Sequence, residues 1–500
     1  MGLTKNPATA LLARNGLDVL PNSAVSVDGT EAGLVASGQR VAILAPSGSQ
    51  VLSGFEGESS ATGDRTLLLG PMSAANLEAL RDLMPWLRPQ PLGTRTSAGF
   101  GDRLGLATPG HVRALRAAGG GIAPIFAQQS IREMERTGRS PREVLDDATW
   151  GAFAEGWQEG SGADADHLKT AEDVDACVAA GYSFFTFDPG EYVDDGAETA
   201  GAIALRTALE DLPWQDLEDV QADLKPRYLG RAFQAEGHEV SFDDHSLALA
   251  AVKYGAAVAL VARLYRHLQS AMGDEDFEVE VSVDETETPT THAQHVYIAT
   301  ELRRLGVRWV SLAPRYVGRF EKGVDFIGDV AEFEEDIEVH AAIARTVSPD
   351  GPYKLSLHSG SDKFSIYPAF VRQTMGLAHL KTAGTSYLEA LRTVSALDAD
   401  LFREIYDFAR GRYEEDRASY HVSASTDRAP DSVGDAELPA LLESFDAREI
   451  LHVTFGSVLK EARFRDRLLG LLREHSEHYA AGLERHFLRH LEPFANGGTP

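Results

Sequence analysis

The chain has 500 residues, of which 76 are Asp or Glu and 47 are Lys or Arg, so its formal net charge at pH 7 is −29. This acidity argues against nucleic acid and against an anionic membrane surface as partners, because both require clustered positive charge. The single cysteine, Cys177, excludes an intramolecular disulfide and any CxxC zinc or redox motif.

Residues 1–95 predict a small N-terminal α+β region. Short apolar pieces at 40–44 and 66–69 lie between turns rich in Gly and Ser, and Pro85, Pro89 and Pro91 close the segment. No residue pattern in this region indicates chemistry.

Residues 96–456 alternate between short apolar runs and stretches with helical periodicity. We expect strands at 123–129, 167–170, 184–188, 278–284, 307–312, 354–358, 377–382 and 451–455. Eight strands that alternate with helices predict an α/β fold, a (β/α)8 TIM-like barrel. A doubly wound open sheet is the alternative, but no GxGxxG follows the first strand. Residues 457–500 predict a helical C-terminal extension.

Polar side chains alternate with apolar ones along the expected strands. The clearest case is segment 278–285, in which three valines alternate with Glu280, Ser282 and Asp284. Because side chains of a strand point to opposite faces in turn, the valines would face the helices and the polar residues the barrel interior. A single polar residue at a strand end can simply cap the strand, but seven strands share this pattern. We therefore expect a polar active site at the barrel mouth.

Three segments carry the candidate metal chemistry. Asp166 and His167 lie at one expected strand end, Asp284 and Glu285 at another, and His358 at a third. Imidazole and carboxylate groups from separate strands suit a divalent cation, and Zn, Mn, Co and Ni all remain open. Asp325, in the long loop after the strand near 312, is a further candidate ligand.

Basic residues near the strand ends predict the charge of the substrate. Arg315, Lys363 and Lys381 are candidate substrate-binding residues, and Arg103 lies in a comparable position. In so acidic a chain they indicate an anionic small molecule as the substrate.

Several further histidines are expected to be structural. His292 and His295 share a helix face and could bind a metal, but a satisfied helix is the favoured interpretation. Five others lie on expected helices among charged residues, where we expect a solvated surface location: His340, His475, His478, His486 and His490.

Several long motifs resemble the tagaturonate epimerase family. They lie at 99–111, 127–133, 164–170, 283–290, 312–315, 357–364, 381–387 and 486–494, and the stretch His358-Ser359-Gly360-Ser361-Asp362-Lys363-Phe364 is among the most specific. The resemblance covers about four-fifths of the chain.

The resemblance implies a metal-dependent enzyme that interconverts D-tagaturonate and D-fructuronate. It places the acid/base pair at Asp166 and one of Asp284 and Glu285, and the metal ligands at His167, His358 and Asp325. Asp166 and His167 would point to opposite faces of a regular strand, so the chain must bend there for both side chains to reach the active site.

The implied reaction limits the mechanism. The two ketouronates differ at the carbon β to the ketone, whose hydrogen is not acidic, so retro-aldol cleavage and re-addition is the expected route. A related ketose epimerase, isomerase or aldolase would use the same residue types, and a non-catalytic sugar-acid sensor is the remaining alternative.

We expect a ketouronate as the partner, with neither nucleic acid nor membrane, and a homo-oligomer is compatible with the sequence. No apolar run approaches the roughly 20 residues that span a bilayer, and the N-terminus lacks the layout of a signal peptide. The expected location is therefore the cytoplasm.

Overall fold

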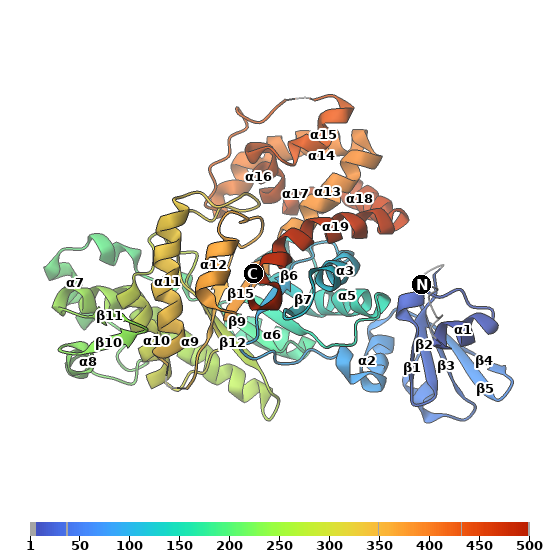
Figure 1. Cartoon of the computed structure of the whole chain (residues 1–500), viewed down its shortest axis with the longest axis horizontal. Coiled ribbons are helices and arrows are strands. Elements are labelled where there is room, and N and C mark those ends of the chain that lie inside the picture. The colour runs from blue at the N-terminus through green and yellow to red at the C-terminus, as the bar shows by residue number, and fades with distance from the viewer. Residues whose placement is uncertain (1–6, 37–38, 349, 432, 499–500) are drawn as a thin grey trace.

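The computed structural model describes residues 7–36, 39–348, 350–431 and 433–498. Its centre is a closed eight-stranded barrel surrounded by helices, with an antiparallel sheet before it and a group of helices after it. Figure 1 shows the N-terminal sheet at one end of the molecule and the C-terminal helices above the barrel. The predicted barrel with two appended regions is confirmed.

The N-terminal region is a five-stranded antiparallel sheet in the order β1-β2-β3-β5-β4. Helix α1 (Pro7–Arg14) precedes it, helix α2 (Ala74–Leu83) follows it, and the strands are β1 (Val25–Val27), β2 (Thr30–Leu34), β3 (Arg40–Pro46), β4 (Glu58–Thr62) and β5 (Arg65–Pro71). Trp150 and Phe153, from a barrel helix, are buried in the same apolar cluster as Leu77 and Leu80 of α2. This packing joins the sheet to the barrel.

The barrel consists of eight parallel strands in the closed order β12-β13-β14-β15-β6-β7-β8-β9. They are β6 (Ser97–Phe100), β7 (Ala123–Ser130), β8 (Gly162–Leu168), β9 (Phe184–Phe187), β12 (Glu278–Ser282), β13 (Ser311–Ala313), β14 (Lys354–Leu357) and β15 (Ala378–Thr382). The register places Glu280 beside Thr186 on one neighbouring strand and Ser311 on the other. The carboxyl ends of all eight strands therefore meet at one mouth.

Helices follow the strands along the chain and cover the outside of the barrel. They are α3 (Thr108–Ala118), α4 (Ile131–Thr137), α5 (Pro141–Ala154), α6 (Ala171–Ala180), α9 (Asp244–Met272), α10 (His292–Arg304), α11 (Val330–Thr346), α12 (Tyr367–Thr374) and α13 (Thr385–Leu397). The expectation that no apolar run approaches the length of a membrane span is corrected by helix α9, which is long and apolar enough to span a bilayer. However, 78% of its most apolar window is buried inside the protein. It is a core helix of the barrel wall.

Two groups of elements extend the barrel. Between β9 and α9 lie α7 (Ala202–Glu210), α8 (Gln221–Tyr228) and a hairpin of β10 (Ala232–Ala235) and β11 (His238–Ser241), on the left of Figure 1. After α13 come α14 (Ala399–Asp416), α15 (Leu438–Leu441), α16 (Phe445–Val453), α17 (Phe455–Lys460), α18 (Ala462–Glu474) and α19 (Ser476–Leu491). Helix α19 packs on α3 so closely that a Cβ at Gly110 would lie 2.5 Å from Leu483 Cβ.

Two strand predictions are corrected by the structure. The segment 451–455 is not a strand, because its first three residues end helix α16 and Phe455 begins α17. The eighth strand is instead β6, whose residues Ser97, Ala98, Gly99 and Phe100 give little β signal. The strand expected at 167–170 is β8, which begins five residues earlier at Gly162.

Candidate active site

The barrel interior is unusually polar for this fold. Bulky aliphatic residues normally fill it, but here Lys381 on β15 projects an ammonium group into a ring of carboxylates. Its Nζ lies 2.7 Å from Asp164 Oδ2, 2.8 Å from Asp166 Oδ1 and 2.8 Å from Glu280 Oε1. These groups come from β8 and β12, and the predicted inward face of β12 is thus confirmed. The three carboxylates raise the pKa of Lys381 despite its burial, so the lysine stays charged.

A bend in β8 brings Asp166 and His167 to the same site. His167 has φ 55°, in the left-handed region, and the register of β8 against β9 shifts between Ala165 and Leu168. This irregularity re-aims a side chain that regular alternation would direct outward. The bend that the sequence required between Asp166 and His167 is therefore present.

Two imidazoles form the centre of the mouth. The rings of His167 and His358 lie 5.2 Å apart, nearly perpendicular, at the ends of β8 and β14. His167 Nδ1 donates to Asp188 Oδ2 over 3.0 Å. His358 Nε2 donates to Glu280 Oε1, and its Nδ1 lies 3.2 Å from Asp284 Oδ1.

The surrounding carboxylates control the charge of both histidines. Burial opposes protonation of His167, but the charge of Asp166 and the hydrogen bond to Asp188 outweigh it and raise the pKa of His167 to about 10. Burial and Lys381 likewise oppose protonation of His358, and the carboxylates Asp284 and Glu280 raise its pKa to about 9. Both rings therefore carry positive charge at neutral pH when no other cation is present.

The donor set fits a divalent cation. One ligand atom each from Asp166, His167 and His358 lies within 4.8 Å of the others, and a second such group consists of His167, Asp188 and Glu285. Glu280 Oε2 is buried and has no hydrogen-bond partner among the described residues. Mixed imidazole and carboxylate ligands suit Zn²⁺, Mn²⁺, Co²⁺ and Ni²⁺. A divalent cation bound between the two rings would take the place of the two protons that the rings carry without it.

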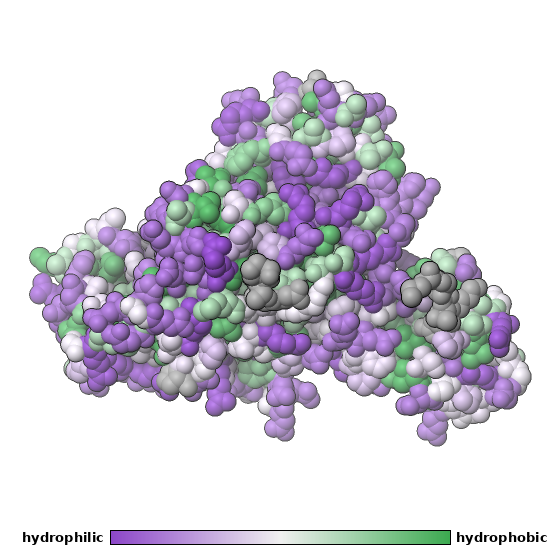
Figure 2. Space-filling model, in the orientation of Figure 1, coloured by the Kyte–Doolittle hydropathy of each residue, from purple (hydrophilic) through white to green (hydrophobic). Residues whose placement is uncertain are grey.

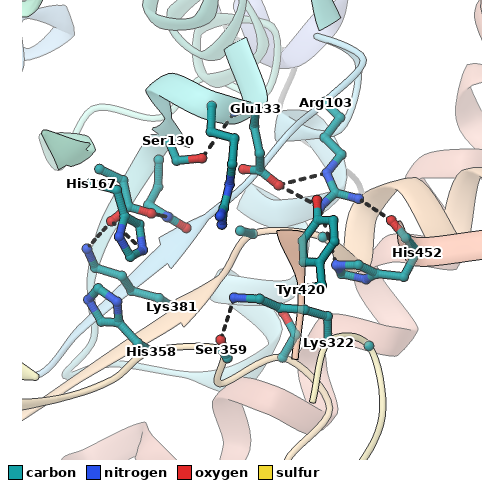
Figure 3. A pocket seen from close by; sticks show the side chains of 17 residues that line it. Arg103, Ser130, Glu133, His167, Lys322, His358, Ser359, Lys381, Tyr420 and His452 are labelled. Carbon is teal, nitrogen blue, oxygen red and sulfur yellow. Dashed lines mark hydrogen bonds and ion pairs between the residues drawn. The ribbon is translucent and has the colours of Figure 1, made fainter. Parts of the chain in front are cut away.

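A ring of basic side chains surrounds the entrance to this pocket. Arg132 on α4 and Lys322 in the loop after β13 both approach Glu285 Oε1, over 3.2 Å and 3.4 Å. Lys322 Nζ also donates to Ser359 Oγ over 2.7 Å. In Figure 3 the side chains of Lys322 and Tyr420 lie between His358 on one side and Arg103 with His452 on the other. The entrance thus combines positive charge with one partly exposed carboxylate.

Two of the predicted site residues, Asp325 and Lys363, line neither this pocket nor the cavity that adjoins it. The Asp325 carboxylate is exposed and accepts hydrogen bonds from Ser365 Oγ over 2.9 Å and from the Phe326 amide over 2.7 Å. Lys363 is buried, and its Nζ donates to the carbonyls of Glu321, Val324 and Ser361. Positive φ at Ser359 and Asp362 turns this loop, so that Lys363 points away from the mouth.

The other predicted basic residues, Lys381 and Arg315, differ in how many of their side-chain donors already have a protein acceptor. Lys381 lines the pocket, but all its hydrogens have buried acceptors, so it holds the carboxylates in place rather than offering a free donor. Arg315 lines the adjoining cavity together with Asp284 and Glu285. Of the nitrogens in the Arg315 guanidinium group, only Nη1 donates within the described part of the chain, to the Tyr316 carbonyl over 2.7 Å.

Sequence reasoning missed several lining residues, most of which come from a helix or from loops. Arg132 lies in the first turn of α4, and Lys322 and Tyr420 belong to long loops, whereas Gln128 lies inside strand β7. Gln128 Nε2 donates to Asp166 Oδ2 over 2.7 Å. The segment 128–133 was the one sequence signal for two of these lining residues, since Gln128 and Arg132 both occur in a motif that carries the family resemblance.

The surface assignment of three histidines is corrected. His340 and His490 are fully buried, and His486 is nearly so. His486 Nε2 contacts Asp362 Oδ1 over 2.7 Å, which helps to fasten α19 to the loop after β14. His452, expected on a strand, lies on α16 but still lines the pocket beside Arg103.

Comparison with known proteins identifies the family of this chain. The family model for tagaturonate epimerase matches residues 26–494. The tagaturonate/fructuronate epimerase of Thermotoga maritima is 46% identical over 419 residues, which are 83% of this chain and 84% of that protein.

Two solved structures of the fructuronate-tagaturonate epimerase UxaE from Cohnella laeviribosi share the fold. The complex with one glycerol has a TM-score of 0.88 at 37% identity and covers 97% of both chains. The native structure has the same TM-score at 36% identity and covers 97% of this chain and 98% of that one. The chain therefore belongs to the tagaturonate epimerase family, a family of isomerases.

Proposed function

We propose that this chain interconverts D-tagaturonate and D-fructuronate at the barrel mouth, with a divalent cation held by His167 and His358. One observation supports this most strongly: two imidazoles within a ring of buried carboxylates face an entrance that carries Arg132 and Lys322. The first feature suits a cation and proton transfer, and the second suits the carboxylate of a sugar acid.

The chemistry of the substrate favours cleavage and re-formation of a carbon–carbon bond. A base removes the proton of the hydroxyl on the carbon β to the ketone, and that carbon becomes an aldehyde as its bond to the α carbon breaks. The bonding electrons form an enediolate across the ketone carbon and the α carbon. After the aldehyde turns its other face, the bond re-forms and the new alkoxide takes up a proton.

Asp166 is the proposed base for one direction. Gln128 Nε2 and Lys381 Nζ each donate to one of its oxygens. Burial opposes the charge, but Lys381, His167 and His358 outweigh burial and hold the pKa of Asp166 below its usual range. The carboxylate is therefore ionised and faces the pocket that His167 and His358 line. A bound divalent cation would act as a Lewis acid that stabilises negative charge on the ketone oxygen.

Glu285 is the proposed partner of Asp166 on the other face of the aldehyde. Its side chain is 28% exposed at the entrance, whereas Asp284 is held by Ser282 and His358. Burial disfavours the charge on Glu285, but Lys322, His167 and Arg132 outweigh burial and lower its pKa. A substrate carboxylate bound to Arg132 and Lys322 would offset their charge, raise the pKa of Glu285 and prepare it to donate a proton.

The anchor for the sugar-acid carboxylate is proposed to be Arg132 with Lys322, and Arg315 supplies charge in the adjoining cavity. Arg132 and Lys322 have partly exposed side chains and share one acceptor, Glu285 Oε1. Lys363 and Lys381 are fully engaged elsewhere. Arginine can also bind a carboxylate through two parallel hydrogen bonds.

The test is direct conversion followed by NMR. The protein with Mn²⁺, Co²⁺, Ni²⁺ or Zn²⁺ is incubated with D-tagaturonate, and we expect D-fructuronate to appear. In D₂O the hydrogen on the epimerised carbon should be retained, because only the hydroxyl proton exchanges in this route. Asp166→Asn should bind the substrate but abolish turnover. Binding without conversion under every metal would reject the proposal, and conversion to separate fragments would indicate an aldolase.

A further inference from the structure

A second cluster of histidine and carboxylate groups lies outside the barrel, between helices α10 and α11. His292 is the first residue of α10, and Asp336 and His340 lie four residues apart on one face of α11. His292 Nε2 is 3.2 Å from Asp336 Oδ1, and His340 Nε2 is 3.5 Å from the same oxygen. One atom from each of the three residues lies within 4.8 Å of the others.

The buried histidine of this cluster has an unused nitrogen that faces the carboxylate. His340 is fully buried, and its Nε2 has no hydrogen-bond partner among the described residues. A buried imidazole nitrogen with no hydrogen-bond partner, beside a carboxylate oxygen, is an arrangement that a cation completes.

A second layer of hydrogen bonds orients His340 for this role. Its Nδ1 lies 2.8 Å from His295 Nδ1, and His295 Nε2 lies 2.7 Å from the Tyr353 hydroxyl. When His340 Nδ1 donates to His295, Nε2 presents its lone pair toward Asp336. Hydrogen bonding of the second ring nitrogen is how metal-binding histidines are normally fixed.

We propose that His292, Asp336 and His340 bind a divalent transition-metal ion of the zinc class, at a site separate from the barrel mouth. Ligand atoms at about 2.0–2.1 Å from a tetrahedral zinc ion lie about 3.3–3.4 Å from one another. The two distances to Asp336 Oδ1 bracket this spacing. His292, with 35% of its side chain exposed, provides the entry path and leaves a ligand position open to water.

The position of the site indicates what the ion would do. Asp336 Oδ2 accepts from the Val317 amide over 3.3 Å, and the Tyr316 ring packs at 5.7 Å from the His340 ring. Both contacts belong to the loop that carries Arg315 and Lys322 to the mouth. A metal that fixes Asp336 and His340 would therefore brace this loop against α10 and α11.

The test counts bound Co²⁺, whose visible absorption reports its coordination, by equilibrium dialysis of the full chain. To remove the barrel ligands, we use the His167→Ala/His358→Ala double variant and expect one Co²⁺ per chain to remain. Adding His292→Ala or Asp336→Asn should abolish this binding, whereas the exposed control His478→Ala should not.

No bound Co²⁺ in the double variant, or binding unchanged by both His292→Ala and Asp336→Asn, would overturn the proposal. If the combined variants do not fold, His292→Ala alone in the otherwise intact chain must lose one Co²⁺ per chain relative to the parent. An unchanged count there would overturn it equally. The proposal does not depend on whether the barrel mouth holds a cation.

Discussion

Replacing Lys381 with methionine should strongly destabilise the barrel. The Lys381 side chain is 3% exposed, and its ammonium group neutralises Asp164, Asp166 and Glu280. Methionine fills similar volume but leaves three crowded carboxylates without the ammonium group that they share. Removing one partner of a buried charge pair costs about 3–5 kcal/mol, and we expect a loss of that size in the free energy of unfolding at pH 8.

Lys354 offers a matched control on the neighbouring strand β14. It is also a buried lysine, but its Nζ donates to Ser97 Oγ over 3.0 Å and burial lowers its pKa to about 8. Ser97 keeps a second partner in His379, so Lys354→Met should cost only about 0.5–1.5 kcal/mol.

The two variants are compared by urea denaturation at pH 5 and pH 8. Without Lys381 the carboxylates have folded-state pKa values above their unfolded values, so folding takes up protons and the deficit of Lys381→Met should shrink at pH 5. The reasoning would be refuted if Lys381→Met were no less stable than Lys354→Met at pH 8, or if its deficit were the same at both pH values.

Three further changes test other parts of the account. Arg132→Met should raise KM for D-tagaturonate about 10- to 100-fold, as expected for a lost charge-assisted bond of about 1.5–3 kcal/mol, and should affect D-tagatose, which lacks the carboxylate, much less. Gly99→Ala should lower kcat in steady-state assays, because the new Cβ would lie 2.9 Å from Gln128 Cγ and displace the donor that holds Asp166; unchanged kcat would contradict this. Burial raises the pKa of Glu449 to about 8, so the wild type should lose stability as pH rises from about 4 to 8, and thermal melts of Glu449→Gln should show a flatter pH dependence.

The barrel could be predicted where a strand shows its two faces. In β12 the valines pack in the core while Glu280 and Ser282 line the interior, so period-two alternation was sufficient. Strand β6 could not be found this way, because its Gly99 is required by the close approach of Gln128 rather than by β propensity. The segment 451–455 has strand-like composition, but helical residues precede it and tertiary packing makes it part of α16 and α17.

The site could be predicted best for side chains at or next to the end of a strand, because the strand fixes where they lie. Asp166, His167 and His358 occupy the mouth because β8 and β14 end there. Residues farther along the following loops, such as Asp325 and Lys363, could not be placed from the sequence, because the direction of a side chain depends on φ at each loop position. Arg132 and Lys322 approach Glu285 from distant segments, and only the fold brings them together.

The central claim is tested most directly by removing and restoring metal in one assay. The purified chain is stripped with a chelator, shown to be metal-free, and mixed with D-tagaturonate while NMR follows the sugar. We predict no conversion until Mn²⁺, Co²⁺, Ni²⁺ or Zn²⁺ is added, then formation of D-fructuronate, and no recovery in His167→Asn or His358→Asn. Undiminished conversion by the metal-free chain, or recovery in both variants, would contradict the account.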